Sequence, residues 1–295
     1  MSAKSVTDKV PPYRLELPAS QKVPLIFSSP HSGRNYPSVL LEQTNLKLRK
    51  LRSLEDCYVD DLFDHVGNDG APFIEAELPR AFLDLNREPY ELDPKLIEPR
   101  LPSYTNPTSL RVKSGLGTIP RIVADGSTIY QAPIMLPDAL ARINQYHQPY
   151  HDKLVELTKA TQKEFGFAIL LDCHSMPSST NLYQNQISAD IILGNRHGTS
   201  CAPHITESVL QAFKSLGFTV KLNKPYAGGF ITEHHGNPET AIHAIQIEIN
   251  RALYMDQITL EKTAGFDDLK SKLKSLTAIL ADKFGSADDV PLAAE

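Results

Sequence analysis

The chain has 295 residues, 41% of them hydrophobic, and a formal net charge of -5. This length suits one large domain or at most two, and the slightly acidic balance argues against nucleic acid or an anionic membrane as the main partner. Cys57, Cys173 and Cys201 are too widely spaced for a zinc ribbon, and an odd number suits a reducing compartment. The polar N-terminus lacks a secretory signal, and no run approaches the roughly 20 apolar residues of a membrane helix. We therefore expect a soluble cytoplasmic protein.

Short apolar runs alternate with longer amphipathic stretches along the chain. In chain order we predict a strand at Val23–Ser28, a helix at Leu54–Val66, strands at Ala71–Glu77 and Ala81–Leu85, a long irregular segment at Glu88–Tyr130, a helical stretch at Pro137–Glu164, strands at Phe167–Leu171 and Asp190–Leu193, a helix at about Thr206–Leu216, strands at Phe218–Leu222 and Ala244–Ile249, and a helix at Leu260–Phe284. Pro149 should kink or divide the helical stretch. The irregular segment is rich in Pro, Gly, Ser and Thr, and such segments inside compact domains are often functional.

Strands separated by helices predict an α/β fold, with a mostly parallel sheet covered by helices on both faces. We expect one domain over residues 23–284, preceded by an N-terminal extension at 1–22 and followed by a loose tail at 285–295. In such folds, ligands bind beyond the carboxyl ends of the strands. The residues that follow each predicted strand are therefore the first candidates for a functional site.

Two histidines stand at the ends of strongly predicted strands. His31 follows the first strand, and Asp172 and His174 close the strand FAILLDCHS. Catalytic zinc needs about three protein ligands, from imidazole and carboxylate groups, and one open position. The third ligand would be Glu55 or Asp56, near the start of the first predicted helix. A single histidine after a strand is more commonly a hydrogen-bonding loop residue, and there is no HExxH pair to strengthen the metal interpretation.

Glu248 lies among isoleucines in the last predicted strand, AIQIEIN. Burial would raise the pKa of this carboxylate unless it is paired. A raised pKa suits a general base that takes a proton from water. An ion pair with Arg251 is an equally good interpretation.

A basic group follows the predicted strand at Ala81–Leu85. Asn86 and Arg87 could hold a substrate carboxylate through a forked donor, although Arg87 could instead be a surface arginine paired with Asp84. Arg121 is a second candidate for the same task. The i, i+4 pair His147 and His151 could bind a metal, but the intervening Pro149 disturbs that geometry, and a partly buried helix surface is the preferred interpretation.

Eight stretches together resemble the N-formylglutamate amidohydrolase family, and they run in the family's order from about residue 23 to about 256. They are SSPHSGRNYP, LEDCYVDDLF, RAFLDLNREP, GLGTIPRI with the following GSTIY, PYHDKL, LLDCHSMP, KPYAGGFIT and IQIEINRALYMD. The resemblance implies a zinc-dependent exopeptidase-like α/β fold, akin to carboxypeptidases and aspartoacylases. This fold has three layers, with a mostly parallel, mixed central sheet. The implied activity is hydrolysis of the amide bond of an N-formyl or other N-acyl amino acid.

The same resemblance assigns site residues. It implies one zinc ion held by His31, Asp56 and His174, with Asp56 preferred to Glu55 as the carboxylate ligand. It places Glu248 where the fold has its general base and matches Asn86 and Arg87 to an asparagine–arginine pair that looks like a carboxylate-binding element. His151 falls on a family-typical histidine to which the resemblance assigns no role.

One departure concerns the residue after Asp56, where the formylglutamate enzymes usually carry an aromatic side chain and this chain has Cys57. We expect the pocket wall to differ there. The expected partner is a small carboxylate-bearing molecule, with no nucleic acid or membrane. Two other functions fit the sequence: a carboxypeptidase-like peptide hydrolase, and a metal-free binding protein for acidic metabolites.

Overall fold

The computed structural model describes residues 10–178 and 189–285 of the chain. These residues group into two compact units. The first comprises residues 10–14, 30–55 and 75–153, and the second comprises 15–29, 56–74, 154–178 and 189–285. Residues 286–295 of the tail expected at 285–295, and the first nine residues of the expected N-terminal extension, lie outside the described residues, whereas Gly285 is the last residue of a helix. The single domain expected over 23–284 stays a prediction.

A sheet of seven strands dominates the described residues, in the order β1-β3-β2-β6-β9-β7-β8. The strands are β1 Tyr13–Glu16, β2 Leu25–Ser29, β3 Phe73–Ala76, β6 Ala168–Met176, β7 Ile191–Gly194, β8 Val220–Leu222 and β9 Ile242–Asn250. β2, β6 and β9 run in one direction, whereas β7 pairs antiparallel with β9 and parallel with β8. The expected α/β fold with a mostly parallel, mixed sheet is confirmed.

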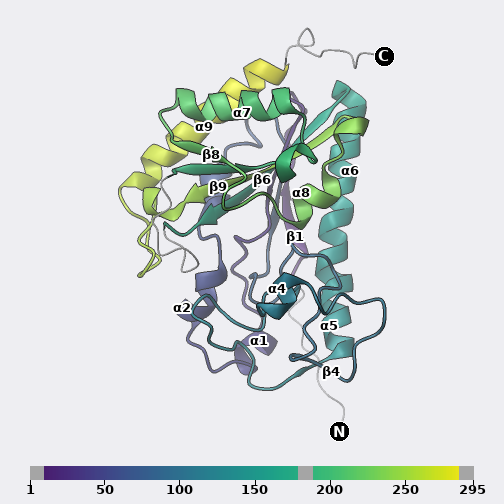
Figure 1. Ribbon diagram of the computed structural model, residues 1–295. Coiled ribbons are helices and arrows are strands. Elements are labelled where there is room, and N and C mark those ends of the chain that lie inside the picture. Colours follow the sequence, from purple (N-terminus) through teal and green to yellow (C-terminus); the bar gives the residue numbers. More distant parts are fainter. Residues whose placement is uncertain (1–9, 179–188, 286–295) are drawn as a thin grey trace. The chain divides into compact units, whose positions relative to one another are not determined.

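Alternation along the central strands separates a hydrophobic face from a polar one. In β9, Ile245, Ile247 and Ile249 point into the main hydrophobic cluster, and the intervening Gln246 and Glu248 point to the opposite face. That cluster also contains side chains of α3 Val59–Phe63, α7 Pro203–Ser215 and α9 Gly265–Gly285, which cover this face of the sheet. Figure 1 shows α7 and α9 lying side by side. α8, Phe230–His235, packs against β9 and β6.

The first unit is built mainly from short elements joined by irregular chain. They are α1 Ser38–Glu42, α2 Leu48–Leu51, the 3-10 turn η1 Arg52–Leu54, β4 Ile97–Glu98, α4 Leu110–Lys113, β5 Ile134–Met135, α5 Leu136–Arg142 and the π-helical turn η2 Ile143–His147. β4 and β5 form a separate two-stranded parallel sheet. α6, Gln148–Phe165, continues directly from η2 and passes from the first unit into the second. The remaining 3-10 turns are η3 Arg196–Gly198, η4 Pro238–Thr240 and η5 Arg251–Leu253.

Most predicted elements are confirmed to within a few residues. Six of the seven predicted strands correspond to β2, β3, β6, β7, β8 and β9, and the late helices correspond to α7 and α9. The segment Glu88–Tyr130 is largely irregular, as expected. β6 is longer than predicted, so Asp172 and His174 lie inside the strand rather than after it. β1 was not predicted.

Two predictions are wrong. Ala81–Leu85 is a series of turns and not a strand, although Ala81, Phe82, Leu83 and Leu85 are buried. The predicted helix at Leu54–Val66 exists only as α3, because Tyr58 has φ 66° in the left-handed region and interrupts the chain before it. Asp56 therefore lies in an irregular segment between η1 and α3.

The helical stretch over Pro137–Glu164 is interrupted beside Pro149, as expected. The interruption is the π-turn η2, which ends two residues before the proline. Pro149 is the second residue of α6, which continues directly from this turn. Among the helices that the structure describes, none combines the length and apolar composition needed to cross a membrane.

The buried His243 on β9 provides a test of the fold. Its Nδ1 accepts a hydrogen bond from the Ala202 N–H at 3.4 Å, and burial, together with the neighbouring His204, lowers its pKa to about 4. The unfolded chain takes up a proton here near pH 6.5 and the folded chain only near pH 4. Unfolding therefore binds a proton in this window, and the free energy of unfolding falls as the pH falls, by at most about 1.4 kcal/mol per pH unit from this residue.

As the pH falls from 6.5 to 4, we expect the thermal stability of His243→Asn to fall less than that of the wild type. Asparagine keeps an acceptor near the Nδ1 position but does not titrate in this range. The measurement is the thermal midpoint across this range. His197→Asn is the matched control, because His197 is exposed and has φ 58°, which asparagine tolerates. Equal pH slopes in the wild type and the His243 variant would contradict the assignment.

Candidate active site

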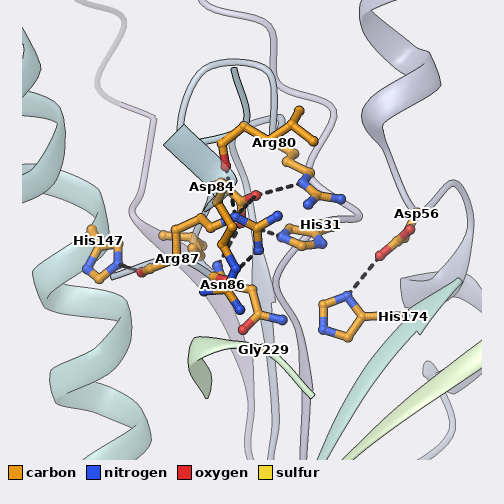
Figure 2. A network of polar contacts seen from close by, with 12 residues as sticks. His31, Asp56, Arg80, Asp84, Asn86, Arg87, His147, His174 and Gly229 are labelled. Carbon is orange, nitrogen blue, oxygen red and sulfur yellow. Dashed lines mark hydrogen bonds and ion pairs between the residues drawn. The ribbon is translucent and has the colours of Figure 1, made fainter. Parts of the chain in front are cut away.

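The second unit contains a buried pair formed by Asp56 and His174. Nδ1 of His174 lies 3.0 Å from Oδ2 of Asp56 (Figure 2), and its Nε2 lies 2.8 Å from Oδ2 of Asp172. Asp172 and His174 stand two residues apart on β6, so both point to the same face of the sheet. β2 pairs with β6 up to Ser28 opposite Asp172, so β6 extends past the end of β2 and presents His174 there.

The other oxygen of Asp56 is also held. Oδ1 accepts hydrogen bonds from Ser175 Oγ and from the guanidinium of Arg251, each at 3.0 Å, and Nε of Arg251 donates to Ser175 Oγ at 2.9 Å. Arg251, which the sequence offered as a partner for Glu248, thus forms an ion pair with Asp56. These bonds fix the carboxylate so that Oδ2 faces the imidazole of His174.

Two carboxylates set the charge at His174. Burial by itself would lower the pKa of this imidazole, but Asp172 and Asp56 raise it well above its ordinary value. The surroundings therefore favour a positive charge. Because Asp172 occupies Nε2, it is Nδ1 that faces Asp56. A carboxylate behind the outer nitrogen of a histidine is the usual support of a metal-binding imidazole.

The first unit contains a matching arrangement around His31. Nε2 of His31 lies 2.7 Å from Oδ1 of Asp84 (Figure 2), and Oδ2 of Asp84 accepts a hydrogen bond from Nε of Arg80 at 2.8 Å. Burial would raise the pKa of Asp84, but Arg80, Arg87 and His31 hold it well below its usual range. An ionised carboxylate only accepts hydrogen bonds, so Nε2 of His31 carries the hydrogen. Nδ1 is then the nitrogen of this ring that can act as a metal ligand.

Asn86 and Arg87 follow Asp84 in the same turn-rich segment. The side chain of Arg87 is only 12% exposed and lies 3.6 Å from Asp84, so the pairing with Asp84 is present but Arg87 is not a surface residue. Its Nε donates to Leu116 O at 3.0 Å and its Nη1 to Asn86 O at 2.9 Å. Burial lowers its pKa to about 10, which leaves it charged at neutral pH. Two backbone carbonyls thus orient the guanidinium, and among the described residues no hydrogen bond uses its Nη2.

Arg121 is placed differently. Its Nε donates to Oδ2 of Asp93 at 2.8 Å, and its side chain is 23% exposed. Within residues 10–178 and 189–285, Arg121 forms no hydrogen bond or ion pair with the side chains of Asn86 and Arg87. The pairing with Asp93 leaves part of the guanidinium available to a ligand.

Glu248 lies next to His174 in the sheet. The two residues are register partners on β9 and β6, so their side chains leave the same face. Glu248 is buried, and its Oε1 accepts a hydrogen bond from Nε2 of Gln246 at 2.7 Å. Oε1 of Gln246 in turn accepts the Gly229 N–H at 2.8 Å. Because a backbone N–H can only donate, Gln246 must present its amino group to Glu248.

The buried side chains of His31, Asp56 and His174 form a group that could hold a metal ion. Two imidazoles and a carboxylate are the donor set of many catalytic zinc sites. In both histidines a carboxylate occupies Nε2, so the donor set and its support fit such an ion.

The family model of N-formylglutamate amidohydrolase matches residues 23–255. The chain belongs to this family. It is 32% identical over 249 residues to an N-formylglutamate deformylase of Pseudomonas aeruginosa, covering 80% of this chain and 84% of the relative. It is 29% identical over 241 residues to an N-formylglutamate deformylase of Pseudomonas putida, covering 80% and 83%.

Solved structures agree with the family assignment. A crystal structure of N-formylglutamate amidohydrolase from Ralstonia eutropha JMP134 matches with a TM-score of 0.87 and 33% identity, covering 93% of this chain and 99% of that one. The gene product Atu2144 from Agrobacterium tumefaciens matches with a TM-score of 0.60 and 15% identity, covering 92% and 95%, and supports the fold alone.

Several groups that support the site of this family member were considered from the sequence only as ion-pair partners or neighbours of other residues, or not at all. They are Arg80, Asp84, Asp172, Ser175, Gln246 and Arg251. Asp172 and Gln246 carried a usable signal, since each stands two residues from a candidate and so shares its strand face. Cys57, at which we expected an altered pocket wall, belongs to the hydrophobic cluster, and its carbonyl accepts the Tyr254 hydroxyl at 3.0 Å.

We expect Asp84→Asn to destabilise the protein by roughly 3 kcal/mol, because the buried carboxylate would lose its charge and with it the ion pairs to Arg80 and Arg87. The measurement is the free energy of unfolding in urea. Asp61→Asn is the control, since the Asp61–Lys262 pair is about one-third exposed at each partner and should contribute about 1 kcal/mol or less. Similar losses in the two variants would show that the charge on Asp84 is not needed by its neighbours.

Proposed function

We propose that this chain hydrolyses the amide bond of an N-formyl amino acid, with N-formylglutamate as the first candidate substrate. The observation that carries the proposal is the family match over residues 23–255. Relatives named N-formylglutamate deformylase cover four-fifths of the chain. The buried polar groups on β6 and β9 and in the Asp84–Arg87 segment supply the types of residue that such a reaction needs.

We further propose that His31, Asp56 and His174 hold one zinc ion. The proposal is supported by their burial as a group and by the two Nε2–carboxylate contacts. Bound zinc polarises an amide carbonyl and makes water more acidic. Ser175 and Arg251 would keep Asp56 in its ligating orientation.

Glu248 is the proposed general base. Its carboxylate accepts a proton from the attacking water and then gives it to the nitrogen of the leaving amino acid. The support is its burial beside His174 and its hydrogen bond from Gln246, which fixes the orientation of Oε1. Gln246 is itself fixed by Gly229, so the base rests on two successive hydrogen bonds.

Asn86, Arg87 and Arg121 are the proposed substrate-binding residues. The guanidinium of Arg87 is held by two backbone carbonyls and can donate from Nη2 without giving up either bond. A pre-oriented donor loses little conformational entropy when it binds a carboxylate. Arg121 keeps part of its side chain exposed and would act in the same way.

Purified protein should release formate from N-formylglutamate in the presence of zinc and should contain about one equivalent of metal. Release of a C-terminal residue from a short peptide, with no formate from formyl amino acids, would favour the carboxypeptidase-like alternative. Protein that binds the acidic ligand without metal and without turnover would favour the binding-protein alternative. Either result would overturn the proposal.

We expect Glu248→Gln to retain the metal and to lower kcat by about 10²- to 10⁴-fold, the usual contribution of a general base. His174→Ala should lose both metal and turnover. Metal content and formate release are measured on the same samples. Glu207→Gln is the matched control, because Glu207 is exposed on α7 and bonds only to Gln211 among the described residues. Near-normal turnover in Glu248→Gln would exclude its role as base.

The proposed roles of Arg87 and Arg121 can be distinguished by comparing two substrates, one with the carboxylate and one without it. A lysine keeps the charge but loses the forked donor, so we expect Arg87→Lys to raise KM for N-formylglutamate about 10-fold or more. The increase in KM should be smaller for an analogue of N-formylglutamate in which the carboxylate bound by the arginine is replaced by an amide. Arg121→Lys is tested in parallel. An equal increase for the acid and the amide would show that the substituted arginine does not bind the carboxylate.

A further inference from the structure

The segment from Phe82 to Arg87 carries Asp84, Asn86 and Arg87 but belongs to no strand or helix. It is nevertheless buried over Phe82–Asn86. Buried backbone carbonyls need hydrogen-bond donors, and without a sheet ladder these must come from elsewhere. In this structure three of these donors are side chains of one continuous helical stretch, formed by α5, η2 and the start of α6, which we call the rod.

Three side chains of this rod donate to three carbonyls of the segment. Nη1 of Arg142 lies 3.2 Å from Phe82 O, and Nε2 of His151 lies 2.9 Å from Leu85 O. Nε2 of His147 lies 2.8 Å from Arg87 O (Figure 2). Since a carbonyl only accepts, both histidines carry their hydrogen on Nε2. Arg142, His147 and His151 are all buried.

The π-turn makes this alignment possible. In a regular α-helix, residues five apart are rotated by about 140° around the axis, so Arg142 and His147 would point to different sides. In η2 the Gln148 N–H bonds to Ile143 O, five residues back, and this wider turn brings side chains five apart nearly into line. His147 and His151 then follow at a spacing of four, with ring centroids 4.3 Å apart.

We propose that His147 and His151 are positioning residues for substrate binding, which hold the Phe82–Arg87 segment through its carbonyls so that Asn86 and Arg87 face the substrate. The inference rests on the proposed function, because it takes these two residues as the substrate-binding pair. The bonds flank the pair: His151 holds the carbonyl before Asn86 and His147 holds that of Arg87 itself. Arg142 anchors the start of the segment and also lies over the ring of Phe82, at 4.0 Å from its centroid.

The contacts separate this role from metal binding and from simple packing. Nε2 of each histidine is used on a carbonyl, which assigns the pair a structural donor role instead of the metal site considered from their spacing. A glutamine can place its Nε2 amino group close to the imidazole Nε2 position, whereas leucine fills a similar space without a donor. Comparing the two replacements therefore isolates the hydrogen bond.

The experiment compares His147→Leu and His151→Leu with His147→Gln and His151→Gln in the full chain. The leucine variants should raise KM for N-formylglutamate about 10- to 100-fold, the scale expected when a binding group is misplaced by an ångström. Their metal content should stay near that of the wild type. The glutamine variants should return KM to within about threefold of the wild type.

Thr158→Val is the control for general loss of stability. Thr158 is buried on α6, and its hydroxyl bonds to Leu154 O within the helix at 2.8 Å. The Thr158→Val variant should have a lower thermal midpoint and an unchanged KM. Leucine variants with unchanged KM, or glutamine variants as impaired as the leucine variants, would overturn the proposal. So would a loss confined to kcat.

Hydrogen–deuterium exchange makes the result independent of turnover. The Asp84 N–H bonds to Thr118 O, and the Asn86 N–H bonds to Oδ1 of Asp84. These amides should exchange faster in the leucine variants and at the wild-type rate in the glutamine and Thr158 variants. If the wild type fails to release formate while this pattern holds, the substrate assignment is wrong and the anchoring is right. Unchanged exchange in the leucine variants would refute the anchoring itself.

Discussion

The hydrogen bond between the outer nitrogen of a buried histidine and a carboxylate is the interaction on which the site depends, and it occurs once in each unit. Asp172 holds His174 in the second unit, and Asp84 holds His31 in the first. Each carboxylate is itself held, Asp172 by the hydroxyl of Ser28 and Asp84 by the guanidinium of Arg80. Ring orientation is thereby tied to a side chain of β2 and to a charged cluster, rather than left to rotamer preference.

These supporting groups explain why so many charges can be buried together. A buried ion costs several kcal/mol unless it is paired and its remaining hydrogen-bonding positions are filled. Asp56 meets this condition through Ser175 and Arg251, and Asp84 through Arg80, Arg87 and His31. The remaining energetic cost is offset by an arrangement that does not need to reorganise when a ligand arrives.

The sequence predicted the sheet well because its central strands are defined by local pattern. β6 begins with a continuous apolar run and β9 is apolar at alternate positions, so both strands and the hydrophobic face of β9 follow from local pattern. That His174 and Glu248 share a face depends on the register between the two strands, which local pattern does not encode. The segment Ala81–Leu85 has a similar apolar content but is not a strand, since its carbonyls bond to side chains of a distant helix. The break at Tyr58 and the pairing of Arg251 with Asp56 likewise depend on tertiary contacts that no local pattern encodes.

The π-turn at Ile143–His147 amounts to one extra residue accommodated in an otherwise continuous helix. Removing a single residue there would restore α-helical winding and change the spacing between Arg142 and the first histidine from five to four, at which side chains of a regular α-helix share a face. The two histidines would keep their mutual spacing and their side of the helix. Two spacings, five with the π-turn and four without it, therefore present the same three donors, so relatives are compared by counting residues across the turn before matching their histidines.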